Sequence, residues 1–115
     1  MAQNQDLSSM KCVPCQGGVP PLSKEEQAGY LEGLQGWKII DHHHLFKGYK
    51  FESFPSAVEW VNRVAELAES EGHHPDIHLS YSQVNIELWT HKIDGLTVSD
   101  FVFASKMDKL PGTPS

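Results

Sequence analysis

The segment from Ser53 to Gly72 constrains the fold more than any other part of this sequence. Its apolar residues recur at intervals of three and four, the spacing of one face of an α-helix. Pro55 suits the first turn, where its missing N–H costs no hydrogen bond, and Gly72 suits the C-terminal cap. Such a helix must cover another apolar surface. The apolar positions are Phe54, Ala57, Val58, Val61, Val64, Ala65 and Ala68.

Two pairs of alternating segments flank this helix and predict two β-hairpins. Residues 37–41 and 44–52 form the first pair, joined by a polar turn at His42-His43. Residues 76–81 and 84–91 form the second pair, joined at Ser82-Gln83. Polar and apolar side chains alternate along these segments with the period of two that strands require. In the last segment Val84, Ile86, Leu88 and Thr90 face one way, while Asn85, Glu87, Trp89 and His91 face the other.

Two capping boxes predict two further helices. Ser23 and Glu26 can each satisfy a free amide at the start of a helix that runs to Gln35 and ends at Gly36. Its predicted apolar side carries Ala28, Leu31 and Leu34. Thr97 and Asp100 form the second box, which opens a helix through Phe101, Val102, Ala104 and Met107.

The predicted order is therefore α-β-β-α-β-β-α, an α+β fold in which helices cover one face of a four-stranded antiparallel sheet. Residues 23–110 form the one domain expected of a chain of 115 residues. Residues 1–22 are rich in Pro, Gly and small polar residues and are expected to be a flexible leader, and residues 111–115 a tail.

Charge and hydropathy exclude several classes of function. Nine Lys and Arg stand against fifteen Asp and Glu, a net charge of −6, which argues against direct binding to nucleic acid. No apolar run reaches membrane-spanning length, and the N-terminus lacks the layout of a secretion signal. We therefore expect a cytoplasmic protein without a membrane partner, in which Cys12 and Cys15 are reduced thiols.

Two adjacent histidines at a corner of the chain are the first candidate catalytic residues. Gly72 ends the long helix, and Pro75 disfavours the helical region for His74, so the rings of His73 and His74 leave an irregular corner. Histidine donates and accepts protons near neutral pH, although paired loop histidines are often only solvated. Glu69 lies in the last helical turn, where a carboxylate opposes the helix dipole, so a second role is plausible.

Cys12-x-x-Cys15 and the run His42-His43-His44 raise the alternative of a metal-binding protein. One Cys pair is a weak signal, because a structural zinc site needs four well-spaced ligands. The three histidines are expected to form a solvated turn, and we predict no metal site.

The spacing of the histidines and their neighbours closely resembles the signature of the pterin-4a-carbinolamine dehydratases, also called 4a-hydroxytetrahydrobiopterin dehydratases. The resemblance extends from about Leu22 to Met107 and leaves out Cys12 and Cys15. The segment Asp76-Ile77-His78 departs from it, since many relatives have an aromatic residue after the acidic one. The matching positions are Glu69, His73, His74, Pro75, Tyr81, His91 and Asp100, with the Gly36-Trp37 step, the Phe-Pro helix start and Gly95-Leu96-Thr97.

The resemblance implies the loss of water from a 4a-hydroxytetrahydropterin, giving the quinonoid dihydropterin that is later reduced and reused by aromatic amino acid hydroxylases. It implies a homodimer or homotetramer and no cofactor. By the same resemblance His73, His74 and His91 line the pterin site as its catalytic residues. We expect His73 and His91 to transfer protons and His74 to orient the pterin. Glu69, Pro75 and Asp100 support the site, with Glu69 polarising a histidine and Asp100 either holding the site or only capping its helix.

A non-catalytic binding or assembly protein is the alternative on the same fold. In animals the family fold also serves as a dimerisation cofactor of a homeodomain transcription factor, and some bacterial relatives have become assembly factors. Those assembly relatives tend to lose the histidine set, whereas this chain retains His73, His74 and His91.

Overall fold

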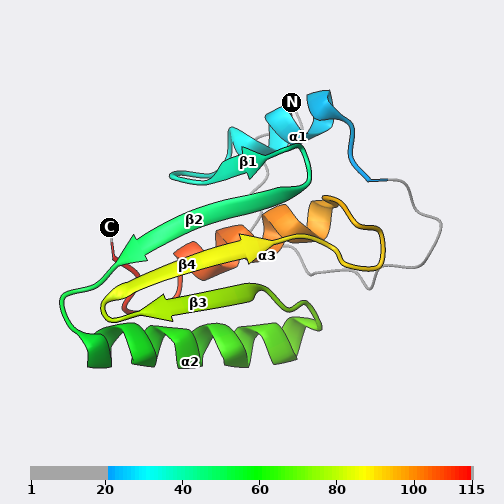
Figure 1. Ribbon diagram of the computed structural model, residues 1–115. Helices are drawn as coiled ribbons and strands as arrows, with labels where there is room; N and C mark the ends of the chain where they lie inside the picture. Colours follow the sequence, from blue (N-terminus) through cyan, green and yellow to red (C-terminus); the bar gives the residue numbers. More distant parts are fainter. Residues whose placement is uncertain (1–20, 115) are drawn as a thin grey trace.

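The computed structural model describes residues 21–114, which form one four-stranded antiparallel sheet with three helices (Figure 1). The predicted element order and the α+β class are confirmed. The strand order is β1-β2-β4-β3, so β2 and β4 are central and β1 and β3 are edges. The elements are α1 (Lys24–Leu31), β1 (Lys38–Ile40), β2 (His44–Lys50), α2 (Phe54–Glu71), β3 (Asp76–Ser80), β4 (Gln83–Leu88) and α3 (Val98–Asp108).

The core lies between the helices and one face of the sheet. Leu45 and Tyr49 of β2 face it together with Val84, Ile86 and Leu88 of β4, and all five are buried. Helix α3 lies behind the two central strands in Figure 1 and is buried on most sides, and α2 contacts β3, β4 and α3. The opposite face of the sheet carries mostly polar side chains.

Helix α2 begins and ends as predicted, but the side it buries is shifted. Ser53 caps its start, and Gly72 ends it in the left-handed conformation, with φ of 67°. The buried stripe is Ala57, Trp60, Val64 and Ala68, whereas the predicted core residue Phe54 is 46% exposed. The indole of Trp60 packs on Tyr49 with ring centroids 4.4 Å apart, so the largest side chain of the helix sets its rotation.

Helix α1 is shorter than predicted and buries a different residue. The capping box is present, with Ser23 N–H donating to Glu26 Oε1 at 2.8 Å. The helix ends at Leu31 instead of Gln35 and continues as tight turns. Gly29 and Gly33 explain this end, because glycine weakens a helix that few turns support. Its buried residue is Gln27, while the predicted core residue Ala28 is exposed.

The hairpin turns lie one residue earlier than the sequence predicts. Asp41 and His42 have φ of 54° and 55°, the left-handed pair of a tight hairpin turn. Tyr81 has φ of 53° and is 73% exposed, so it belongs to the turn and not to the buried face of a strand. Strand β4 ends at Leu88 instead of His91, and only an isolated bridge between Thr90 and Gly95 follows it.

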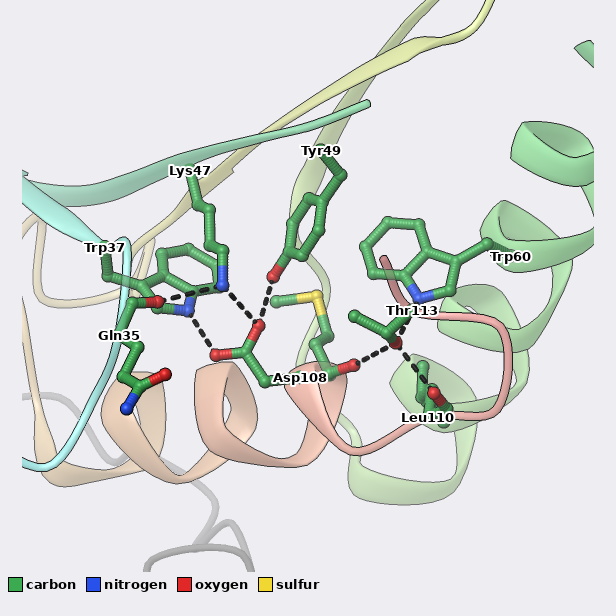
Figure 2. A network of polar contacts seen from close by, with 9 residues as sticks. Gln35, Trp37, Lys47, Tyr49, Trp60, Asp108, Leu110 and Thr113 are labelled. Carbon is green, nitrogen blue, oxygen red and sulfur yellow. Dashed lines mark hydrogen bonds and ion pairs between the residues drawn. The ribbon is translucent and has the colours of Figure 1, made fainter. Parts of the chain in front are cut away.

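A network of polar contacts connects the β1–β2 hairpin, and Trp37 just before it, with Asp108 at the end of α3 (Figure 2). The Asp108 carboxylate accepts hydrogen bonds from Trp37 Nε1 at 2.8 Å, Lys47 Nζ at 2.9 Å and Tyr49 Oη at 2.7 Å. Lys47 also donates to the carbonyl of Gln35 at 2.8 Å. Burial, and then the charge and hydrogen bond of Asp108, raise the pKa of the Tyr49 hydroxyl well above its usual range.

The residues after α3 pack on α2. Trp60 Nε1 donates to Thr113 Oγ1 at 2.7 Å (Figure 2). Arg63 Nη1 donates to the carbonyl of Pro111 at 3.1 Å. Between residues 21 and 114 no helix is long and apolar enough to cross a membrane. The predicted leader with Cys12 and Cys15 lies outside the described residues, apart from Pro21 and Leu22.

Candidate active site

His73 is held by the end of one helix and the start of another. Its backbone N–H donates to the carbonyl of Ala68 at 3.2 Å, which closes the C-terminal turn of α2 around Gly72. Its Nε2 lies 2.6 Å from Oδ1 of Asp100, in the first turn of α3. The His73 side chain is 11% exposed and that of Asp100 is fully buried. The pair therefore joins two elements 27 residues apart in the sequence.

The other Asp100 oxygen is also engaged, and this indicates which ring nitrogen of His73 carries the proton. Oδ2 accepts hydrogen bonds from Thr90 Oγ1 and from the N–H of Thr97, each at 2.9 Å. An ionised carboxylate only accepts hydrogen bonds, so His73 Nε2 must carry the proton and act as its third donor. A neutral His73 then carries its lone pair on Nδ1, which makes no hydrogen bond with another residue of the described chain.

His74 and Glu69 form a more exposed pair. His74 Nε2 lies 2.7 Å from Glu69 Oε2, and the two side chains are 60% and 79% exposed. Glu69 thus contacts His74 and not His73. A contact this exposed adds little to stability, but it restricts the ring of His74 at the corner where Pro75 already limits the backbone.

His91 lies just beyond β4 and is oriented by an aromatic neighbour. Its ring meets Trp89 edge-on, with centroids 4.4 Å apart. Its Nε2 lies 4.0 Å from Oδ1 of Asp76, the first residue of β3, and the His91 side chain is 54% exposed. His91 and His74 are therefore both accessible to solvent, whereas His73 is the enclosed member of the set.

All three candidate histidines lie at one end of the sheet, where α2 leads into β3 and where β4 ends. Thr90 connects His73 and His91, because its hydroxyl donates to Asp100, which contacts His73, while its chain neighbour is His91. Asp100 both caps α3, by accepting from the N–H of Thr97, and contacts His73. Thr90 and Asp76 were not identified as site residues from the sequence. A hydroxyl on the buried face of the last strand is the signal that could have indicated Thr90.

The triple histidine is not uniformly solvated, contrary to expectation. His42 is exposed, but His43 and His44 are half-buried, and their rings lie 5.2 and 5.7 Å from that of Trp89. The hairpin turn falls on Asp41 and His42, so His43 and His44 fold back over the sheet. The ring centroids of His43, His44 and His91 thus all lie within 5.7 Å of that of Trp89.

Comparison with known proteins identifies relatives of this chain. A family model described as pterin 4 alpha carbinolamine dehydratase matches residues 20–110. Two proteins provisionally named pterin-4-alpha-carbinolamine dehydratase, from Rubrobacter xylanophilus and Alkaliphilus metalliredigens, are each 51% identical over 105 residues. The first match covers 91% of this chain and 98% of that protein, the second 90% and 95%. A match of 105 residues within 115 spans Cys12 and Cys15 wherever it begins.

Two solved structures share the fold. A transcriptional coactivator/pterin dehydratase from Brucella melitensis is 31% identical with a TM-score of 0.73, over 76% of this chain and 95% of that one. A pterin dehydratase-like protein identified as a RuBisCO assembly factor of the alpha-carboxysome is 27% identical with a TM-score of 0.59, over 70% and 94%.

Proposed function

The chain belongs to the pterin 4 alpha carbinolamine dehydratase family, and from this we propose that it removes water from a 4a-hydroxytetrahydropterin. The C4a–O bond breaks, the N5 proton leaves, and a C4a–N5 double bond forms to give the quinonoid dihydropterin and water. The reaction needs an acid at the leaving oxygen and a base at N5. It consumes no oxidant or reductant, so the residues of the chain suffice.

The contact between His73 and Asp100 is the observation that carries this proposal. Asp100 Oδ1 lies 2.6 Å from His73 Nε2 and favours the ring proton on that nitrogen, so Nδ1 can act as the base for the N5 proton. The His73 side chain is 11% exposed, and its Nδ1 is not one of the buried unpaired polar atoms of the described chain, so a bound pterin could reach it. A carboxylate that orients a histidine in this way also stabilises the imidazolium that forms.

His91 is proposed as the acid that protonates the leaving hydroxyl. It is exposed enough to exchange protons with solvent, and both Trp89 and Asp76 limit the orientation of its ring. His74 is proposed to bind the pterin, with Glu69 holding its ring. His74 therefore contributes to affinity and not to proton transfer.

The test is dehydration of a chemically generated 4a-hydroxytetrahydropterin, followed by absorbance with and without the protein. Single replacement of His73 or His91 by alanine is expected to slow turnover by up to about 10²–10⁴, and the double variant should lose more than either. His74→Ala should raise KM and leave kcat nearly unchanged. His42→Asn is the matched control, because His42 is exposed at the neighbouring turn. Wild-type turnover in a folded double variant would refute the assignment.

We also propose that the protein assembles as a homodimer or homotetramer in the cytoplasm. Strands β1 and β3 are edges of the sheet, and unpaired edges are usually covered. Leu79 of β3 and the adjacent Tyr81 are 38% and 73% exposed. Light scattering at micromolar concentration should report a dimer or tetramer, and a monomer alone would contradict this.

A non-catalytic assembly role is the alternative, supported by the fold shared with the RuBisCO assembly factor. The dehydration assay separates the two, because an assembly protein should not accelerate loss of water. Failure of the wild-type chain in that assay would favour the alternative.

A further inference from the structure

His91 lies in a tight loop, residues 90–95, that follows β4. The loop closes on itself, because the N–H of Thr90 donates to the carbonyl of Gly95 at 2.9 Å. The N–H of Asp94 donates to the carbonyls of Thr90 at 2.9 Å and His91 at 3.2 Å. Asp94 has φ of 58°, a left-handed conformation that aspartate adopts more readily than most residues. The backbone of His91 is therefore coupled directly to that of Asp94.

The side chain of Asp94 is contacted from the β1–β2 turn. His43 Nε2 lies 2.7 Å from Asp94 Oδ1, across 51 positions of the sequence. An ionised carboxylate only accepts hydrogen bonds, so His43 Nε2 is the donor. Nδ1 of His43 lies 3.1 Å from Nδ1 of His44, and one ring proton between them satisfies both atoms. Both ring nitrogens of His43 are thus engaged, which restricts the rotation of its ring.

The turn that carries His43 is itself held in place. Its central residues Asp41 and His42 adopt the left-handed pair of a tight hairpin, and the N–H of His43 donates to the carbonyl of Ile40 at 2.9 Å. The buried side-chain amide of Gln27, in α1, donates to the carbonyl of His42 at 2.9 Å. His43 therefore extends from a backbone that hydrogen bonds hold from both the hairpin and a helix.

Trp89 contacts both His43 and His91. Its ring centroid lies 5.2 Å from that of His43 and 4.4 Å from that of His91, which it meets edge-on. Aromatic rings at such distances prefer particular relative orientations, so each ring limits the rotation of the next. The contacts form a closed circuit, which runs from His43 to Trp89, to His91, through the loop backbone to Asp94 and back to His43.

We propose that His43 is a positioning residue for His91. Trp89 restricts the ring of His91, Asp94 restricts its backbone, and His43 holds both. His91 needs such support, because its side chain is 54% exposed and its Nε2 lies 4.0 Å from the Asp76 carboxylate, beyond hydrogen-bond distance. A general acid must stay within reach of the leaving oxygen. The inference rests on the proposed role of His91 as the acid, and it gives a role to a histidine outside the positions that match the family signature.

Four substitutions separate the two arms of this support. His43→Gln keeps a donor for Asp94 but loses the ring beside Trp89, whereas His43→Phe keeps the ring and loses the donor. Asp94→Gly removes the carboxylate without straining the left-handed backbone, and Asp94→Asn keeps an oxygen acceptor. The side chains of His43 and Asp94 are 32% and 83% exposed, so all four variants should fold. His42→Asn, at the exposed neighbouring position, is the matched control.

The kinetic expectation is a lower kcat at nearly unchanged KM in the dehydration assay. His43→Gln, His43→Phe and Asp94→Gly should each lower kcat by about 2–10-fold, the range to which one aromatic or ionic contact corresponds. Asp94→Asn and the control His42→Asn should stay close to the wild type. In the His91→Ala background His43→Gln should cause no further loss, because the ring that it positions is gone.

A second measurement requires no pterin. The ring current of Trp89 shifts the NMR signals of the His91 ring protons, so these signals should move in His43→Gln and Asp94→Gly and stay in place in His42→Asn. Unchanged His91 signals in the folded His43 variants would overturn the proposal, as would a loss confined to KM or an equal loss of kcat in the His91→Ala background. If the wild-type chain fails to dehydrate the pterin, the proposed function is wrong, and the His91 signals still decide whether His43 positions that ring.

Discussion

Replacement of Asp100 by asparagine should reduce turnover by moving the ring proton of His73 from Nε2 to Nδ1. An asparagine side chain fills the same space but presents one carbonyl oxygen and one NH₂ group. When the NH₂ group faces His73, Nε2 must become the acceptor and the proton moves to Nδ1. The ring then cannot act as a base at Nδ1, so the loss should approach that of His73→Ala, up to about 10²–10⁴.

The fold should survive this change. The Asp100 carboxylate accepts from His73, Thr90 and Thr97. Hydrogen bonds to a charged group contribute roughly 1.5–3 kcal/mol and neutral ones about 1 kcal/mol, and asparagine retains some of the neutral ones. A net loss of about 2–4 kcal/mol is smaller than the 5–15 kcal/mol typical of a domain. Urea unfolding followed by circular dichroism would measure it.

A double-mutant cycle tests whether Asp100 acts through His73. Wild type, Asp100→Asn, His73→Ala and the double variant are compared by kcat at saturating pterin. If the carboxylate works by orienting the ring, Asp100→Asn should add little in the absence of that ring. An equal loss in both backgrounds, in folded proteins of the same oligomeric state, would refute the reasoning.

Three further predictions concern the core and the leader. Asp108→Asn should destabilise the protein by about 2–3 kcal/mol in urea, because Lys47, Trp37 and Tyr49 lose a charged acceptor, whereas the exposed control Glu66→Gln should stay within about 0.5 kcal/mol. The raised pKa of Tyr49 means that the unfolded chain ionises first, so stability should fall above pH about 10; an equally steep fall in Tyr49→Phe would contradict this. Deletion of residues 1–20 should largely retain turnover, because the family match begins only at residue 20, and loss of turnover in a folded truncated protein would place the leader in the reaction.

Local signals in the sequence determined most of the fold. The apolar repeat of α2, its proline and its glycine cap depend on neighbours within four residues, so its limits could be predicted. The two alternating pairs likewise fixed the hairpins, since a period of two does not suit a helix. The rotation of α2 was not predictable in this way, because Trp60 is buried by its contact with Tyr49 of β2.

The sequence also indicated which residue types gather at the candidate site, but only the tertiary structure decided their partners. His73 meets Asp100 across 27 residues, and His43 meets Asp94 across 51. Such contacts depend on how α2, α3 and the hairpin turns pack together, and a one-residue shift in a turn decides which histidines face solvent. The exposure of His42 and the convergence of His43 and His44 follow from the turn at Asp41 and from packing against Trp89, neither of which a local pattern specifies.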